Sequence, residues 1–297
     1  MTDLAVETRD LGKRYRASWA LQDCSIDVPS GRVCGLVGSN GAGKTTLIRL
    51  LAGLSRPTTG HATVGGRPPA DDPAFLREIG YLAQDVPLYR RWNAADHLAL
   101  GAHMNEVWDQ SVTVDRLRSL GIPLDRPIEA LSGGMRAQVG LALALGKRPR
   151  VLLLDEPVAA LDPLARRQFL ASLAAAVGEG DLTVLLSSHL LADLERVCDH
   201  LVLLAGGRPV ICSDIDELLA SHKLLTAAAR DTTAIEHHHH VVTSVRTPRQ
   251  VTLTVKLDGP MLDPAWAVHD LGLEEIVLAY LEGGSVPTPD HALEVVR

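Results

Sequence analysis

The sequence predicts an α/β fold, and two observations carry this prediction. Several short runs rich in leucine and valine are apolar on both faces, which is typical of strands buried within a parallel sheet. Longer helical patterns separate these runs, and such alternation of strands and helices indicates an α/β sheet. The predicted strands are residues 33–37, 79–83, 151–154 and 183–186.

Helical patterns lie between and after these strands. The predicted helices are residues 44–52, 94–106, 112–120, 134–145, 164–177 and 190–197. Two apolar runs at 201–204 and 209–211 flank Gly206 and Gly207, and this arrangement predicts a closing hairpin.

The alternation of short apolar strands with longer helices ends near residue 223. We therefore expect a main domain over 1–223 and a small C-terminal extension over 224–297. In residues 251–257, apolar and polar side chains alternate with a period of two, which is typical of a half-buried strand. Residues 271–281 have apolar side chains at helical spacing. The extension is therefore predicted to hold a strand or two and one helix. A frayed tail is expected at 285–290, which contains two prolines.

Composition excludes several classes of protein. A chain of 297 residues with 46% hydrophobic and 22% charged residues is globular and can bury a sizeable core. The net charge of −7 argues against a general nucleic-acid binder. No stretch between charged residues reaches the roughly 18 residues that cross a bilayer, and the N-terminus lacks a signal-peptide pattern. We therefore expect a soluble chain whose membrane role, if any, depends on a partner.

A glycine-rich loop between a predicted strand and a predicted helix matches the phosphate-binding pattern G-x-x-x-x-G-K-[ST]. It consists of Gly38, Ser39, Asn40, Gly41, Ala42, Gly43, Lys44, Thr45 and Thr46. The glycines allow backbone N–H groups to turn toward phosphate oxygens at a helix N-terminus. Lys44 would reach the β- and γ-phosphates, and Thr45 would ligate Mg²⁺. An ordinary glycine-rich turn is the alternative, but the strand-to-helix context favours the phosphate loop.

Two carboxylates follow the strand at 151–154. An aspartate at the end of a buried strand is costly unless it is paired, and Mg²⁺ is a suitable partner for Asp155. Glu156, one residue later, could orient or deprotonate an attacking water molecule. Taken alone, the pair could also be the capping turn of a following helix. The phosphate loop earlier in the chain favours a shared site.

The tetrapeptide Leu131-Ser132-Gly133-Gly134 lies between these two motifs and begins a predicted helix. It resembles the signature sequence of ATP-binding cassette (ABC) ATPases, usually LSGGQ. Other motifs of that family follow in the expected order: Tyr15 for the adenine-stacking aromatic residue, Gln84 for the Q-loop, Asp162 for the D-loop and His189 for the switch histidine. The resemblance covers roughly residues 4–220. It implies a P-loop ABC ATPase domain with a mixed sheet and a helical subdomain at about 92–146.

The resemblance implies ATP and Mg²⁺ as ligands, with Thr45, Gln84 and Asp155 near the metal and Glu156, His189 and Gln84 in catalysis. In the family, two cassettes pair head to tail, so that the Ser132-Gly133-Gly134 segment of one caps the nucleotide of the other. The expected partner is a second copy of the chain or a paralogous ATPase. Separate transmembrane permease subunits are also expected, which would hold the chain at the inner face of the membrane. No nucleic-acid partner is expected.

Some positions depart from the family pattern or allow more than one interpretation. Met135 stands where the signature usually has glutamine, and we interpret it as a variant because the anion site is formed by the backbone. Trp19 could replace Tyr15 in stacking. The loop 85–92 is either an anchor for the membrane partner or a solvated loop. The run 237–240 of four histidines is expected to be a polar loop rather than a metal site.

The predicted function is ATP hydrolysis that energises export of a drug, an antibiotic or a lipid-like molecule. A helix containing the sequence LEEIVLAYL near the C-terminus resembles the tail of bacterial drug-export ATPases. One alternative is a non-transport ABC ATPase that acts on ribosomes or DNA. Another is a regulatory module that closes on ATP without turnover.

Overall fold

The computed structural model describes residues 3–283 except 71, 179 and 262. The chain divides into two compact units, Met1–Asp214 and Ile215–Arg297. The boundary between the units lies earlier in the chain than the one that the sequence predicted after residue 223. The reason is that helix α8 (Ile215–Ser221) packs on strand β10 (His222–Ala228) within the second unit. The frayed tail predicted at 285–290 lies outside the described residues.

A six-stranded sheet forms the centre of the first unit, with strand order β5-β6-β7-β3-β8-β9. Its strands are parallel except for the antiparallel hairpin of β8 and β9. Every residue of β3, β6 and β7 is buried, which confirms the α/β prediction made from their apolar runs. The strands are β3 (Val33–Val37), β5 (Ile79–Leu82), β6 (Val151–Leu154), β7 (Thr183–Ser187), β8 (His200–Ala205) and β9 (Arg208–Asp214).

A second, antiparallel sheet of three strands has the order β2-β1-β4 and was not predicted from the sequence. Its strands are β1 (Leu4–Tyr15), β2 (Ser18–Pro29) and β4 (Thr59–Val64). Buried residues of this sheet, such as Leu11 and Leu21, form one apolar cluster with Leu47 of α1 (Lys44–Leu51) and Leu185 of β7. The two sheets therefore share a core through α1, the helix that follows the glycine-rich loop.

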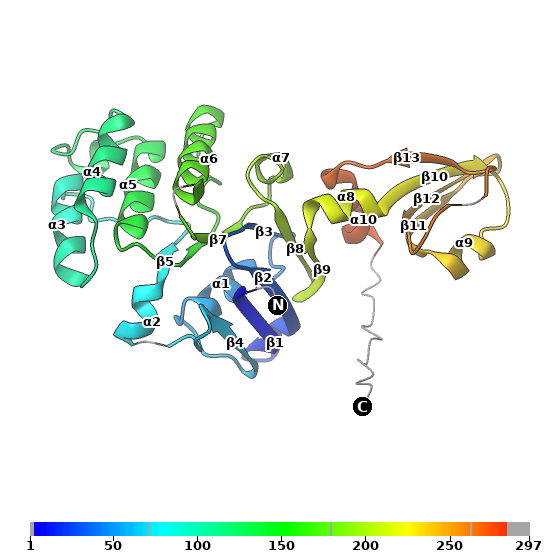
Figure 1. Cartoon of the computed structure of the whole chain (residues 1–297), viewed down its shortest axis with the longest axis horizontal. Coiled ribbons are helices and arrows are strands. Elements are labelled where there is room, and N and C mark those ends of the chain that lie inside the picture. Colours follow the sequence, from blue (N-terminus) through cyan, green and yellow to red (C-terminus); the bar gives the residue numbers. More distant parts are fainter. Residues whose placement is uncertain (1–2, 71, 179, 262, 284–297) are drawn as a thin grey trace. The chain divides into compact units, whose positions relative to one another are not determined.

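Three helices that lie side by side in Figure 1 have an apolar cluster of their own. They are α3 (Ala94–Met104), α4 (Gln110–Ser119) and α5 (Gly133–Gly146). Side chains of Asn93, Asp109 and Ser132 cap their N-termini, as these residue types do by accepting from free backbone N–H groups. The other helices of this unit are α2 (Pro73–Glu78), the 3₁₀ turn η1 (Ile128–Ala130), α6 (Pro163–Gly178) and α7 (Leu191–Leu194).

The second unit contains a four-stranded antiparallel sheet with the order β11-β12-β10-β13, where the sequence predicted only a strand or two. The strands besides β10 are β11 (His240–Arg246), β12 (Gln250–Lys256) and β13 (Ala267–Asp270), and the helices besides α8 are α9 (Thr233–His238) and α10 (Leu273–Glu282). Only β12 has a sequence in which apolar and polar residues clearly alternate. Its buried Leu253 and Val255 pack with Leu225, Ile235 and Trp266.

The histidine run 237–240 is not the loop that the sequence predicted. Its first two residues end α9, and His240 begins β11. His239 is buried between them, and its Nδ1 accepts a hydrogen bond from the backbone N–H of Asp258 at 3.3 Å. Among the described residues, no group of three or more His, Cys, Asp or Glu side chains is placed to hold a metal ion.

His222 connects three elements of the second unit. The imidazole is 1% exposed; its Nδ1 lies 2.8 Å from the carbonyl oxygen of Leu218 in α8, and its Nε2 lies 2.9 Å from the hydroxyl of Tyr280 in α10. Burial lowers the pKa of His222 below its usual 6.5, and the charges of Lys256, His240 and Lys223 lower this pKa further, although the hydrogen bond with the Leu218 carbonyl opposes the decrease. The neutral ring is therefore the form that this packing stabilises.

We expect the second unit to lose stability in mild acid for this reason. A group whose pKa is lowered by folding contributes its full stabilisation above the unfolded value of about 6.5 and loses it as the pH falls below that value. The protection factors of the α10 amides against hydrogen exchange, which correct for the slower intrinsic exchange in acid, should decrease between about pH 7.5 and pH 5. The variant His222→Gln, which cannot titrate, should lose most of this pH dependence, and an equal decrease of the protection factors in that variant would contradict the assignment.

Candidate active site

The glycine-rich loop connects the end of β3 to the start of α1. Gly43 is the N-cap of α1 and has φ +103°, a left-handed conformation that side chains rarely adopt. A Cβ atom at this position would lie 2.6 Å from the carbonyl oxygen of Ala20. Glycine is therefore required here, and it directs the first N–H groups of α1 toward the space above the loop.

Lys44 is held above the loop although it is almost fully buried, at 5% exposure. Its Nζ donates to the carbonyl oxygens of Gly38 at 2.7 Å and Ser39 at 3.3 Å. The same ammonium lies 3.4 Å from Oε1 of Glu156. Lys44 is thus oriented by the glycine-rich loop and by the carboxylate of Glu156, a residue that follows strand β6.

Asp155 directly follows β6 and is 2% exposed. Its Oδ1 accepts from the hydroxyls of Thr45 at 3.0 Å and Ser187 at 3.2 Å. Burial raises the pKa of Asp155, while these two hydrogen bonds oppose the increase. A buried carboxylate beside a threonine hydroxyl forms a set of hard oxygen ligands, so these residues fit a Mg²⁺ ion.

Glu156 follows Asp155 in a left-handed backbone conformation, with φ +46°. Its backbone N–H donates to Oγ of Ser187 at 2.8 Å, which holds the turn. The Oε2 atom of Glu156 lies 3.3 Å from Nδ1 of His189, whose side chain is 43% exposed. One carboxylate therefore contacts the phosphate-loop lysine with one oxygen and the histidine with the other.

These residues border one cavity of about 650 Å³. Its lining brings together most residues predicted from the motifs, namely Tyr15, Asn40, Gly41, Ala42, Gly43, Lys44, Thr45, Thr46, Gln84, Glu156 and His189. Ser39 contributes its backbone carbonyl to Lys44, and Asp155 lies beneath Thr45. Tyr15 is 46% exposed at this cavity, whereas Trp19 does not line it. The arrangement can hold a polyanion against Lys44 and place a water molecule beside Glu156.

The Ser132-Gly133-Gly134 segment is not part of that lining. Oγ of Ser132 accepts from the backbone N–H of Met135 at 3.2 Å, so the serine caps the 14-residue helix α5. A Cβ atom at Gly134 would lie 2.7 Å from Cβ of Ala165, and glycine therefore permits the close approach of α5 and α6. The side chain of Met135 packs against the apolar cluster of α3, α4 and α5.

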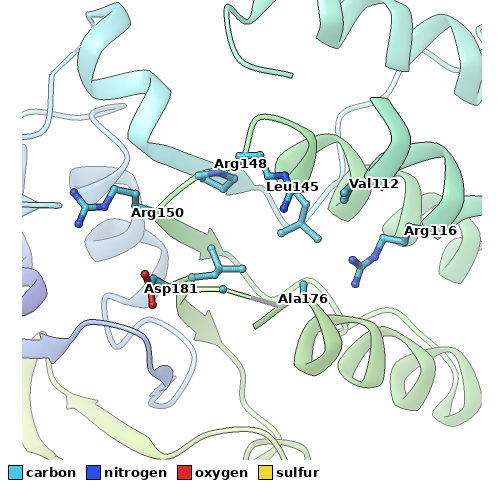
Figure 2. A pocket seen from close by; sticks show the side chains of 10 residues that line it. Val112, Arg116, Leu145, Arg148, Arg150, Ala176 and Asp181 are labelled. Carbon is cyan, nitrogen blue, oxygen red and sulfur yellow. The ribbon is translucent and has the colours of Figure 1, made fainter. Parts of the chain in front are cut away.

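A separate hollow of about 200 Å³ lies at the other end of β6, beside α4, α5 and α6 (Figure 2). Three arginines line it, and the guanidinium groups of two of them form hydrogen bonds within the chain. Arg148 donates to Oδ2 of Asp109 through Nε and Nη2, and Arg116 donates to the carbonyl oxygen of Ser172. In Figure 2, the side chain of Arg150 points away from Leu145. This hollow contains none of the residues predicted for the active site.

Comparisons with known proteins agree with the geometry of the larger cavity. The model of the ABC transporter family matches residues 21–159. Methionine import ATP-binding protein MetN 1 of Burkholderia lata is 36% identical over 238 residues, which cover 75% of this chain and 69% of that protein. This chain belongs to the ATP-binding proteins of ABC transporters.

Other relatives of this ABC protein differ in what they transport. Nod factor export ATP-binding protein I of Sinorhizobium fredii is 34% identical over 216 residues, which cover 71% of this chain and 63% of that protein. A solved structure of an ATP-binding subunit of an ABC transporter superposes with a TM-score of 0.65 and 31% identity, over 73% of this chain and 92% of that chain. The fold is thus the α/β P-loop fold of ABC ATPases.

Ser187 is a residue of this ABC site that the sequence did not reveal. It is fully buried at the end of β7, donates to Asp155 and accepts from the backbone of Glu156. A serine at the end of a buried strand is a weak signal by itself. It becomes informative only when β6 and β7 are known to be neighbours, because their parallel pairing places the two strand ends together.

We expect the substitution Gly43→Ala to weaken ATP binding. The added Cβ would approach the Ala20 carbonyl at a backbone conformation that strains alanine, and the loop must shift. A strain of about 1–3 kcal/mol would lower ATP affinity by about five- to a hundred-and-fiftyfold if binding requires the native loop. Calorimetric titration with ATP would measure this loss of affinity. Gly178→Ala, where a Cβ meets nothing within 4 Å, should bind ATP like the wild type.

Proposed function

We propose that this chain hydrolyses ATP to energise export of a small molecule through separate transmembrane subunits. The observation that carries the proposal is the single cavity bordered by the phosphate loop, Glu156 and His189. The cargo class proposed is a drug, an antibiotic or a lipid-like product. The chain would act at the inner face of the membrane through its transmembrane partner. Among the described residues, no helix is long and apolar enough to cross a membrane.

ATP would bind with its phosphates against the loop 38–46, where Lys44 and the N-terminal N–H groups of α1 neutralise their charge. Tyr15, at the rim of the cavity, would stack on the adenine. Thr45 and Asp155 would hold Mg²⁺, with Gln84 near it. The bound ion would neutralise charge on the β- and γ-phosphates.

In the reaction, water attacks the γ-phosphorus, the bond to the β–γ bridging oxygen breaks, and ADP and phosphate form. Glu156 would accept the proton of the attacking water, because its carboxylate is the acidic group that faces the cavity beside Lys44. His189 would donate to the γ-phosphate from the ring nitrogen that does not face Glu156.

A second cassette is part of the proposal because the Ser132-Gly133-Gly134 segment lies outside the cavity of its own chain. This segment begins a long helix and presents N–H donors that suit a phosphate. In a head-to-tail dimer, it would cap the nucleotide of a second copy or of a paralogous ATPase. ATP binding would then close the dimer, and hydrolysis would open it.

The loop 85–92 supports the interaction with a membrane subunit. Tyr89 is 61% exposed, and its ring lies 4.7 Å from the ring of Trp92. Beneath them, Nε2 of the buried His97 accepts from the backbone N–H of Tyr89 at 3.0 Å, and Nδ1 contacts the carbonyl oxygen of Asn93 at 2.7 Å. His97 thus fixes the exposed aromatic pair within the loop that follows Gln84 in the sequence, and a fixed aromatic pair suits an interface anchor.

The export direction is supported by α10, whose sequence LEEIVLAYLE resembles the tail of drug-export ATPases. Transport in inside-out membrane vesicles that contain the chain and its transmembrane subunit tests the direction. We expect ATP-dependent accumulation of a hydrophobic drug inside such vesicles, and none with Glu156→Gln. Release of the substrate from the vesicles, or dependence on a substrate-binding protein, would indicate an importer such as the methionine protein.

A further inference from the structure

A histidine, an aspartate and a cysteine lie together on the hairpin of β8 and β9, within the first unit. His200 and Asp214 face each other as a cross-strand pair, and Cys212 precedes Asp214 by two residues on β9. Side chains two residues apart point to the same face of a strand, so this register places all three on one face of the hairpin. None of the three lines the cavity bordered by the phosphate loop. They therefore form a cluster that the ATP site does not use.

Polar contacts connect the three side chains and end at the sulfur atom. Oδ1 of Asp214 lies 3.2 Å from Nδ1 of His200, and Nε2 of His200 lies 3.6 Å from Sγ of Cys212. An Nδ1–H group that donates to the carboxylate leaves Nε2 of the neutral ring without a hydrogen, so Nε2 can accept the proton of the thiol. The imidazole is 6% exposed, and packing therefore fixes its orientation. A nucleophile, a base and an orienting carboxylate in this order activate a weak nucleophile.

Cys212 differs from the other three cysteines of the chain in its surroundings. It is exposed, whereas Cys24 and Cys34 are buried and Cys198 is partly buried. Among the described residues, its sulfur is also the one cysteine sulfur that contacts a histidine ring. A dissolved reagent can therefore reach this sulfur, and the other cysteines provide a comparison within the same chain.

The resting sulfur of Cys212 is a thiol rather than a thiolate. Burial raises the pKa of Cys212 above its usual 9.0, and the hydrogen bond with the Asp27 backbone and the charge of Arg9 offset only part of this increase. The thiolate is the reactive form of cysteine, so the thiol must lose its proton as the sulfur attacks. Nε2 of His200 is the group in contact with the sulfur that can accept this proton.

We propose that Cys212 is a site of reversible oxidation by peroxide and of S-thiolation, with His200 as the base and Asp214 as the residue that orients it. In the first step the sulfur attacks one oxygen of hydrogen peroxide, the S–O bond forms and the O–O bond breaks. The thiol proton passes through Nε2 of His200 to the leaving hydroxide, which becomes water, and the cysteine becomes a sulfenic acid. In the second step a small thiol attacks the sulfenic sulfur, so that a disulfide forms and the oxygen leaves as water.

The test treats the full chain with hydrogen peroxide, traps sulfenic acid with dimedone, and measures the adduct on each cysteine-containing peptide by mass spectrometry. We expect the adduct on Cys212 and none on Cys24 or Cys34, which are buried. His200→Gln should slow adduct formation by about tenfold or more, because the group that accepts the proton is removed. Asp214→Asn should slow it less, since the ring remains but no carboxylate orients it. Glutathione added after peroxide should form a mixed disulfide on Cys212, which a reductant returns to the thiol.

The matched control is His103→Gln, which makes the same replacement on α3, where the ring contacts a carbonyl oxygen of its own helix. It should leave the labelling of Cys212 unchanged. Unfolding of a variant would be recognised by labelling of the two buried cysteines, and Asp214→Asn, at a side chain that is 46% exposed, tests the same contacts with less disturbance of the core. No adduct on Cys212, or equal rates in the wild type, His200→Gln and Asp214→Asn, would overturn the inference. Because the readout does not involve ATP hydrolysis, that result would leave the proposed function intact.

Discussion

Replacing Glu156 by glutamine is expected to reduce ATP hydrolysis by about 10²- to 10⁴-fold. Glutamine has nearly the same shape, but its amide cannot accept the proton of the attacking water. The substitution also removes the negative charge that lies 3.4 Å from Lys44 and 3.3 Å from His189. Phosphate release in a single turnover would measure the loss, and binding of a fluorescent ATP analogue should be retained.

The same variant should accumulate in a nucleotide-bound dimer, because ATP would close the two cassettes and hydrolysis would no longer open them. Light scattering with and without ATP would detect this change in mass. Glu195→Gln is a suitable control, since it removes an exposed carboxylate that does not line the cavity and should hydrolyse ATP normally. Undiminished turnover in Glu156→Gln would contradict the role of Glu156 as the base.

The sequence predicted those strands and helices that can be recognised from a short run of neighbouring residues. Strands β3 and β6 are apolar throughout because both of their faces are covered, so their limits were predicted at the residues where the structure has them. The sheet of β1, β2 and β4 was missed because the register of β1 shifts at several points, which destroys a simple alternation of buried and exposed residues. The sheet of the second unit was underestimated because β13 is exposed throughout and β11 is only half-buried.

The residues of the candidate site also divide into those that a short sequence motif identifies and those that only the family resemblance or the three-dimensional structure identifies. Lys44, Thr45, Asp155 and Glu156 were derived from short motifs whose chemistry depends on neighbouring residues in the chain. Gln84 and His189 were assigned only through the resemblance to ABC ATPases, because nothing local distinguishes a glutamine or histidine after a strand. Ser187 was not assigned because its contacts with Asp155 depend on which strands are neighbours in the sheet.

Mixing two inactive variants should restore hydrolysis if two copies of the chain pair head to tail. Lys44→Ala disables the phosphate loop, and Ser132→Arg disables the segment that would cap the partner's nucleotide. In a mixed dimer, one site carries both defects, and the other combines an intact loop with an intact capping segment. Random pairing places half of the chains in mixed dimers, each with one intact site of two, so we expect about a quarter of wild-type activity.

The pair Lys44→Ala and Glu156→Gln provides the matched control for this experiment. Both residues border the cavity of the same chain, where Nζ of Lys44 lies 3.4 Å from Oε1 of Glu156. Every site of such a mixed dimer contains one defect, so mixing should restore nothing. Activity is measured as phosphate release after the purified variants are mixed in excess ATP. Restoration by the Ser132→Arg mixture alone would show that Ser132 acts on the partner's nucleotide, whereas no restoration in either mixture would contradict a homodimer with shared sites.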